Sequence, residues 1–402
     1  MKHIARSAAA VVLALSVFGA VAQDALRPEV GKPLQAAQEM LKAGRYKDAL
    51  AKVREAEAVG NRSTYETYIL DRMRASAAAS AGDNELAARA FESAIASGRP
   101  NAAERLQLIE ALASSAYRGK DYARAAEWAS KYLKEGGAAA QVRELMVNAL
   151  FLAGNYAGVI GAVTPWVKSG EAADEHTLQL LANSYAKVGD TAGYMTSLEA
   201  LLRQAPKQDY WADLLSRLPG KPGFSERLAL DVYRLRSATG TLTDAAQFVE
   251  MAQLALQAGL PAEAKKVVDA GFTAGALGVG ADENRHRRLR EMAGKQAAED
   301  QKTLATFDAG TRASPEAWAN TGGALVSVGR FEKGLDLMTQ ALQKVDQGDK
   351  ALKRPEDLRL HLGLAHLAAG NASKAAETLR AVKGGDGAAD LARLWLLKLA
   401  HP

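Results

Sequence analysis

Cysteine is absent from this sequence of 402 residues, and aromatic side chains and long apolar runs are scarce. A chain without cysteine has no disulfide bond, no thiolate nucleophile, no zinc–thiolate site and no thiol for a lipid anchor. Aromatic residues make up 6% of a composition that is 48% apolar, and alanine supplies much of the apolar share. This composition favours closely packed helices over an aromatic core and argues against an all-β fold.

The sequence also has no large excess of charge of one sign. Lys and Arg total 51 against 46 Asp and Glu, which gives a net charge of +5. So small and evenly spread a charge does not call for a nucleic-acid partner. A Walker loop, a nucleophile elbow and a zinc-binding helix are all missing, and His361 and His366 are five residues apart, on different faces of a helix. We therefore expect no catalytic residue, no metal site and no cofactor.

The first 22 residues have the pattern of an export signal. Two basic residues precede an apolar run over residues 7–21, and Ala20 and Ala22 form the small-x-small pattern that signal peptidase cleaves. An uncleaved anchor is the alternative, but the run is shorter than the roughly 20 residues that span a bilayer. We expect cleavage after Ala22 and a soluble periplasmic protein that begins at Gln23, with no lipid anchor and no integral membrane segment.

Residues recur along the rest of the chain with a period close to 35. The glycines expected in turns are separated by 35, 70 and 70 residues and are Gly154, Gly189, Gly259 and Gly329. Gly223 and Gly294 lie at or beside the two skipped positions, which predicts two degenerate repeats there. A fixed period of this length is typical of solenoids built from one repeated unit.

Large, small and aromatic residues keep fixed offsets around these glycines. One unit contains Leu178, Leu181, Ala182, Tyr185, Gly189, Leu198, Leu201 and Pro206. The offsets recur at 318–341 and 248–268, and a small residue occupies the eighth position in Ala37, Ala75, Ala113, Ala182, Ala252, Gly322 and Gly363. The pattern resembles the tetratricopeptide-repeat family over nearly all of the mature chain. The resemblance implies an all-α, right-handed α-solenoid of about ten helical hairpins, some of them degenerate.

The repeats divide the mature chain into three parts. We expect an N-terminal array over 23–205, degenerate middle repeats over 206–302, and C-terminal repeats with a closing helix over 303–402. The middle part is the least regular because the Pro-Gly-rich segment 218–223 cannot continue a helix. Ser314 followed by Pro315 predicts the start of a helix in the last part.

The family resemblance also implies where a partner binds, because the first helix of each hairpin lines the concave groove. The ninth position of that helix holds uncharged hydrogen-bonding residues, namely Gln38, Ser76, Ser114, Asn148, Asn183 and Gln253. Flanking groove positions add Glu144, Phe151, His176 and Gln179. Amides and hydroxyls pair with the backbone of an extended peptide whatever its sequence. Glu144 would repel a terminal carboxylate, so we expect recognition without a carboxylate clamp.

A basic run follows the irregular middle segment and contains Arg285, Arg287, Arg288 and Arg290. One interpretation is a solvated helix face. The other is a contact with an anion, a lipid headgroup or an acidic protein.

Two functions fit these features. The first is a non-enzymatic periplasmic scaffold that binds a protein or an extended peptide in its concave groove and supports an envelope complex. Tyr210, Trp211 and the closing segment 391–395 loosely resemble tetratricopeptide proteins of TonB and ExbB energy-transduction systems, which ranks such a complex first among the partners. The alternative is an accessory factor for peptidoglycan or polysaccharide handling, which needs exposed aromatics along the groove to stack on sugars.

Overall fold

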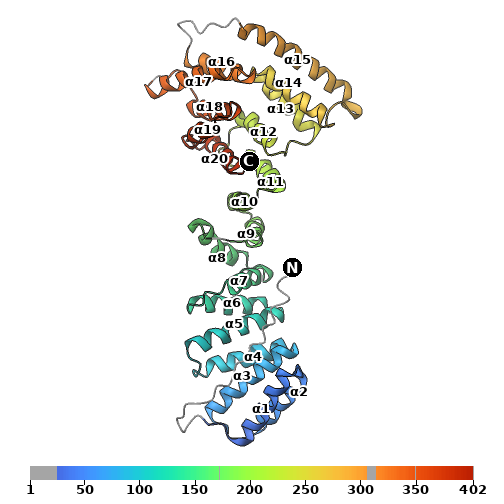
Figure 1. Cartoon of the computed structure of the whole chain (residues 1–402), viewed down its shortest axis with the longest axis vertical. Helices are drawn as coiled ribbons and strands as arrows, with labels where there is room; N and C mark the ends of the chain where they lie inside the picture. The colour runs from blue at the N-terminus through green and yellow to red at the C-terminus, as the bar shows by residue number, and fades with distance from the viewer. Residues whose placement is uncertain (1–24, 172, 306–313, 349, 402) are drawn as a thin grey trace. The chain divides into compact units, whose positions relative to one another are not determined.

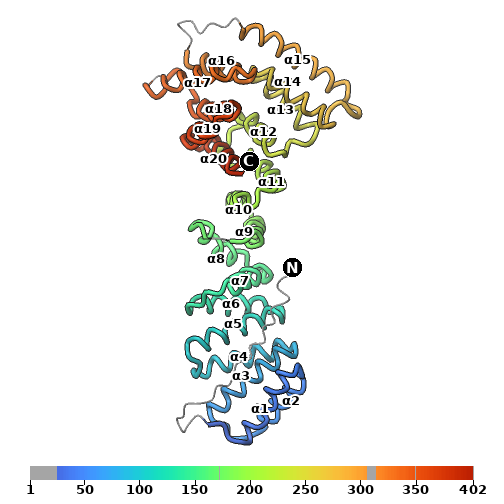
Figure 2. Tube along the Cα trace, viewed as in Figure 1, coloured from blue at the N-terminus to red at the C-terminus, as the bar shows by residue number. Residues whose placement is uncertain are grey.

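The computed structural model describes residues 25–171, 173–305, 314–348 and 350–401, and throughout these ranges the chain forms helices joined by turns, without β-strands (Figures 1 and 2). The expected all-α solenoid fold is confirmed. The expected signal peptide, 1–22, lies outside the described residues. Within the described ranges, none of the helices combines the length and the apolar composition needed to cross a bilayer.

The chain forms two compact units, Met1–Tyr194 and Met195–Pro402, which are described separately. The helices of unit 1 are α1 (Pro28–Lys42), α2 (Tyr46–Glu57), α3 (Thr64–Ala81), α4 (Asn84–Ala96), α5 (Ala102–Arg118), α6 (Tyr122–Lys134), α7 (Ala140–Leu152), α8 (Tyr156–Ser169) and α9 (Glu175–Val188). The unit boundary falls inside α10 (Thr191–Gln204).

The helices of unit 2 are α11 (Gln208–Arg217), α12 (Ala229–Ala238), α13 (Ala245–Gln257), α14 (Pro261–Thr273), α15 (Glu283–Ala305), α16 (Pro315–Ser327), α17 (Phe331–Asp346), α18 (Pro355–Ala368), α19 (Ala372–Arg380) and α20 (Ala388–Ala400). Short 3-10 turns lie at η2 (Leu218–Gly220), η3 (Glu226–Leu228) and η4 (Gly280–Asp282). The helix expected after Ser314 is confirmed, because the Ser314 hydroxyl accepts a hydrogen bond from the Ala317 N–H at 3.2 Å.

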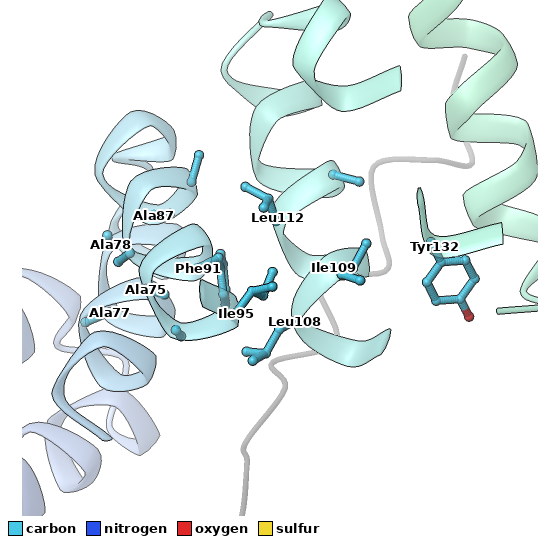
Figure 3. Packing of buried hydrophobic residues seen from close by; sticks show 14 of the residues in the cluster. Ala75, Ala77, Ala78, Ala87, Phe91, Ile95, Leu108, Ile109, Leu112 and Tyr132 are labelled. Carbon is cyan, nitrogen blue, oxygen red and sulfur yellow. The ribbon is translucent and has the colours of Figure 1, made fainter. Parts of the chain in front are cut away.

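The helices of unit 1 pack as stacked hairpins. Each helix packs against the next one. The first helices of successive hairpins also contact one another, so that α7 touches both α5 and α9. The small eighth-position residues Ala37, Ala75 and Ala113 are fully buried. Figure 3 shows the larger side chains of the same core, including Phe91 of α4 and Leu112 of α5. The hairpins therefore bury one another's apolar faces in one continuous core, as a solenoid requires.

The same closely packed position is occupied by a glycine in two hairpins of unit 2, at Gly322 and Gly363. A Cβ added to Gly322 of α16 would lie 2.8 Å from the Gly334 carbonyl oxygen of α17 and 2.5 Å from Cγ of Met338. Gly334 faces the matching constraint, since its Cβ would lie 2.8 Å from the Gly322 oxygen. The backbones of α16 and α17 thus approach so closely that neither position has room for a methyl group.

A recurring turn joins the two helices of the hairpins. The residue in the turn has a left-handed backbone, with φ of 74° at Gly154. The N–H of Asn155 then bonds to the Leu150 carbonyl at 2.9 Å, and Asn155 Oδ1 accepts from the Gly158 N–H at 2.9 Å. The first bond completes a Schellman motif and the second caps the next helix. The same pair of bonds recurs at Asp83, Asp121 and Asp190.

The α5–α6 turn departs from this pattern at one residue. Lys120 occupies the left-handed position with φ of 64°, whereas Gly119 before it has φ of −73°. A residue with a Cβ adopts the left-handed region at a cost of about 1 kcal/mol relative to glycine. The turn keeps its form because Asp121 still makes both bonds, to the Ala116 carbonyl and from the Arg124 N–H.

Unit 2 departs from the expected repeat at Gly294. The sequence predicted a hairpin turn there, and this prediction is wrong, because Gly294 lies in the middle of α15, a single helix of 23 residues. Leu289, Ala293 and Ala297 form a buried stripe on this helix, which packs against α14. A glycine inside a helix costs about 1 kcal/mol, which such packing outweighs. The opened turn predicted at 218–223 is confirmed, since α11 ends at Arg217 and α12 begins at Ala229.

Helices far apart in the sequence contact one another in unit 2. A simple solenoid has contacts only between neighbouring repeats. Here α12 packs against α20 (Figure 1), and Arg393 of α20 binds Glu199 of α10 at 2.9 Å. Four further polar side-chain contacts span at least 130 residues and join Lys221 to Asp390, Arg227 to Asp357 and Asp386, and His361 to Asp231. The first and last helices of unit 2 are therefore held together.

Asp231 of α12 is at the centre of the most buried of these contacts. The residue is 2% exposed, and its carboxylate lies 2.7 Å from Nη1 of Arg234 and 3.0 Å from Nε2 of His361 on α18. Arg234 also binds Glu263 of α14 at 2.6 Å. Burial alone would raise the pKa of Asp231, but the contacts with His361 and Arg234 outweigh burial and hold this pKa below its usual range.

We expect Lys120→Gly to stabilise unit 1 by about 0.5–1 kcal/mol, because glycine removes the left-handed strain. Urea unfolding followed by circular dichroism measures the change. Gly154→Lys at the equivalent turn is the matched control and should destabilise by a similar amount. A Lys120→Gly protein no more stable than the parent would show that this turn is not strained.

We expect Arg227→Gln to destabilise unit 2 by about 2 kcal/mol at pH 7, because it leaves Asp357 and Asp386 without their shared partner. Hydrogen bonds from Arg227 hold the pKa of Asp386 below its usual value. The stabilisation is therefore present above the ordinary carboxylate pKa of about 4 and is lost as the pH falls through the lower, folded value.

Urea unfolding measures this change, and hydrogen exchange should show faster opening of α18–α20. Arg217→Gln is the control because it removes an exposed pair with Asp213 on the same helix, which is worth about 0.5 kcal/mol or less. Equal effects of the two substitutions would contradict a special role for the long-range contacts.

Candidate binding surfaces

The predicted polar column of unit 1 lies beside the buried small residues of the first helices. Its members Gln38, Ser76, Ser114 and Asn148 are half-buried, and Asn183 is exposed. The residue before each of them is buried, as Ala37 and Ala182 illustrate. The helix register therefore places one residue in the core and leaves the next polar one accessible to solvent. We define these five residues as the polar column.

Most side chains of the polar column have no hydrogen-bond partner in the described ranges. Gln38, Ser76, Ser114 and Asn183 form no side-chain hydrogen bond to any described residue. Their donors and acceptors are therefore left to water or to a binding partner.

The structure brings three of the predicted groove residues together on α7 and α9. Oδ1 of Asn148 lies 2.9 Å from Nε2 of His176, and Nδ2 of Asn148 donates to the Glu144 carbonyl at 2.9 Å. The bond to His176 links the first helices of adjacent hairpins, whereas the bond to Glu144 lies within α7. A peptide that uses the Asn148 amide must therefore replace these two bonds or bind beside them.

Two flanking residues have contacts of their own. Phe151 packs edge-to-face with Tyr156, with ring centroids 5.4 Å apart, and lies against the core of unit 1. Gln179 donates to the Glu175 carboxylate at 3.3 Å. Phe151 therefore contributes mainly to packing at the α7–α8 turn.

A cavity in unit 2 brings three of the remaining predicted residues together. It has a volume of about 200 Å³ and lies between α13 and α15. Its lining consists of Val249, Gln253, Arg285, Arg288, Leu289 and Met292. We call this cavity the α13–α15 groove. It joins Gln253 with two arginines of the basic run, which the sequence analysis treated as separate sites.

The four arginines of the basic run have different environments. Arg287 pairs with Glu283 on its own helix. Arg290 binds Asp269 at 2.7 Å and lies 4.8 Å from the centre of the Phe272 ring. Hydrogen bonds from Lys265 and Arg290 hold the pKa of Asp269 below its usual value. The remaining two arginines form no ion pair in the described part of the chain, and these two line the groove.

The apolar part of the groove was not predicted. Leu289 and Met292 follow Arg285 at helical spacings of four and seven residues, and Met292 is 44% exposed. This spacing would have shown one helix face if the segment had been read as a continuous helix, but Gly294 was interpreted as a turn. Val249 comes from α13, and only the packing of α13 against α15 places it there.

Two further features bear on the choice of site. Among the residues described, no group of three or more His, Asp or Glu is arranged to hold a metal ion.

A second cavity, of about 650 Å³, lies along α8 and includes Thr164 and Tyr185, whose hydroxyls are 2.9 Å apart. It contains none of the predicted groove residues.

No protein-family model matches the chain, and no curated protein matches its sequence. Solved structures with a similar fold include the following three. The TPR2AB domain of yeast Sti1 in complex with pHSP90 is 16% identical, with 66% of this chain and 98% of that chain covered and a TM-score of 0.37. The C-terminal part of a TPR repeat protein from Cytophaga hutchinsonii is 14% identical, with 65% and 93% covered and a TM-score of 0.33. The pentatricopeptide repeat protein PPR10 from maize is 17% identical, with 91% and 56% covered and a TM-score of 0.32.

The stacked hairpins, buried small residues and recurring Schellman turns define the class of protein. The chain is an α-solenoid whose hairpins resemble tetratricopeptide repeats, as the sequence pattern predicted.

Proposed function

We propose that the chain is a non-enzymatic periplasmic scaffold that binds a protein or an extended peptide along the polar column of unit 1. The observation that carries this proposal is the accessibility of five uncharged polar side chains at one register of successive first helices. Four of them have no partner among the described residues, so they offer donors and acceptors to an extended backbone.

An envelope energy-transduction complex is the first partner to test, because the ends of the chain loosely resemble tetratricopeptide proteins of TonB and ExbB systems. Residues at both ends of unit 2 that carry this resemblance have structural roles. Trp211 and Leu391 are buried, and Arg393 holds Glu199. A partner is therefore more readily accommodated at the solvent-accessible polar column than at these residues.

The alternative role in peptidoglycan or polysaccharide handling is less well supported. Stacking on sugars needs exposed aromatic faces. Tyr46, at the start of α2, is the one exposed aromatic side chain within the described ranges. Two tryptophan rings are each covered by a basic side chain. Nζ of Lys131 lies 4.4 Å from the centre of the Trp128 ring, and the guanidinium carbon of Arg143 lies 4.8 Å from the centre of the Trp166 ring, so these faces are not free to stack on a sugar.

We expect the double substitution Asn148→Ala and Asn183→Ala to weaken partner capture while changing the free energy of unfolding by less than about 1 kcal/mol. The stability change is small because both side chains reach the surface and only Asn148 loses hydrogen bonds. Crosslinking in intact cells, followed by mass spectrometry of the captured proteins, measures the first effect, and thermal unfolding measures the second.

The control is Lys47→Ala with Glu127→Ala, two exposed positions on second helices whose joint removal leaves the net charge unchanged. Equal capture by the parent and the Asn148/Asn183 variant would contradict binding at the column. Recovery of glycan fragments without any envelope protein would favour the alternative function.

We expect the exported protein to begin at Gln23, because signal peptidase cleaves after the small-x-small pattern. Intact-mass measurement of protein released by osmotic shock tests both the cleavage site and the periplasmic location. Full-length protein found only in the cytoplasmic or membrane fraction would contradict export and cleavage.

A further inference from the structure

We propose that the α13–α15 groove of unit 2 binds a peptide segment in which an aspartate or glutamate stands beside an apolar residue. This inference rests on the proposed function, because it names the chemistry of a partner segment that the scaffold recognises. It concerns unit 2 and is independent of the polar column in unit 1.

The charges around the groove point to a carboxylate. Arg285 and Arg288 line it and have no ion-pair partner among the described residues, whereas Arg287 and Arg290 on the same helix are both paired. Two guanidinium groups one helical turn apart suit a carboxylate, which accepts hydrogen bonds from arginine in a bidentate manner. The pair therefore has unused capacity for an acidic side chain.

The acidic residue of α13 and the first acidic residue of α15 are already engaged. Glu250, the acidic residue of α13, accepts a hydrogen bond from the Tyr233 hydroxyl at 2.7 Å. Burial, together with this hydrogen bond, raises the pKa of Tyr233 to about 12. Glu283 on α15 pairs with Arg287. Glu291, the next acidic residue of α15, forms no ion pair with Arg285 or Arg288, so among the described residues neither of these two guanidinium groups is bound by a carboxylate.

The rest of the lining points to an apolar neighbour of that carboxylate. Val249, Leu289 and Met292 provide the apolar part, and Met292 is 44% exposed although its side chain is large and apolar. Gln253 adds an amide that can donate to and accept from a peptide backbone. A methionine-containing surface adapts to apolar side chains of different shapes.

The size of the groove favours a peptide side chain over a small molecule. Its volume of about 200 Å³ is below the roughly 300–1,000 Å³ of pockets that enclose small ligands. A groove of this size holds one or two side chains of a segment that continues outside it.

The test is selection of a random dodecapeptide phage library on the mature chain, followed by fluorescence anisotropy with the enriched peptides. We expect enrichment of peptides in which an acidic residue adjoins an apolar one. Arg285→Gln with Arg288→Gln should weaken their binding about tenfold or more, because both charge-assisted hydrogen bonds are lost.

The matched control is Arg287→Gln with Lys302→Gln. It removes the same charge from α15, but from side chains paired with Glu283 and Glu299. We expect affinity within about twofold of the parent, because exposed pairs contribute little. Replacing the peptide carboxylate by its amide should weaken binding to the parent and have little further effect on the Arg285/Arg288 variant.

Three results would overturn the inference. Enriched peptides that bind the Arg285/Arg288 variant as tightly as the parent would leave the proposed function standing but remove this site from it. Failure to enrich any peptide would count against both this groove and the proposed peptide-binding function. Arginine-dependent binding to phosphatidylglycerol vesicles, with no acidic peptide enriched, would assign the groove to a lipid surface instead.

Discussion

The fold depends on a sharp reversal of the chain between two helices, at a turn whose hydrogen bonds complete the end of one helix and the start of the next. A left-handed residue makes the reversal, and the next residue satisfies the end of one helix with its N–H and the start of the next with its side chain. Because this turn recurs with the same geometry, successive hairpins present their small residues at the same register. Lys120 shows that the geometry persists even where glycine is missing.

Unit 2 adds a constraint that stacking alone does not provide. In unit 1 each hairpin packs against its neighbours in the sequence. The hairpins are therefore stacked in the order in which they occur along the chain. In unit 2 ion pairs between residues at least 130 positions apart join the early helices to the late ones. Asp231 is buried, and its charge is stabilised only because α18 brings His361 and α12 itself supplies Arg234. Within this unit, packing against α13 and α14 positions α15 and its arginines.

The two candidate surfaces differ in the chemistry they offer. The polar column presents neutral donors and acceptors, which suit a peptide backbone and give little sequence preference. The α13–α15 groove presents positive charge beside apolar side chains, which suits particular side chains and gives selectivity. Under the two proposals, the polar column binds an extended chain with little sequence preference, and the α13–α15 groove recognises a particular segment.

The sequence alone determined the helical class, the hairpin repeat and the buried small residues, because these follow from local spacing that every unit repeats. It also identified Ser314 and the opened turn at 218–223, where proline and serine act on their own neighbours. It failed at Gly294, since a helical glycine and a turn glycine look alike until the packing of Leu289 and Ala293 is known. Only the tertiary structure decided that Gln253 lies with Arg285 and Arg288 and that Asp231 meets His361, because such contacts join residues whose separation in sequence carries no periodic signal.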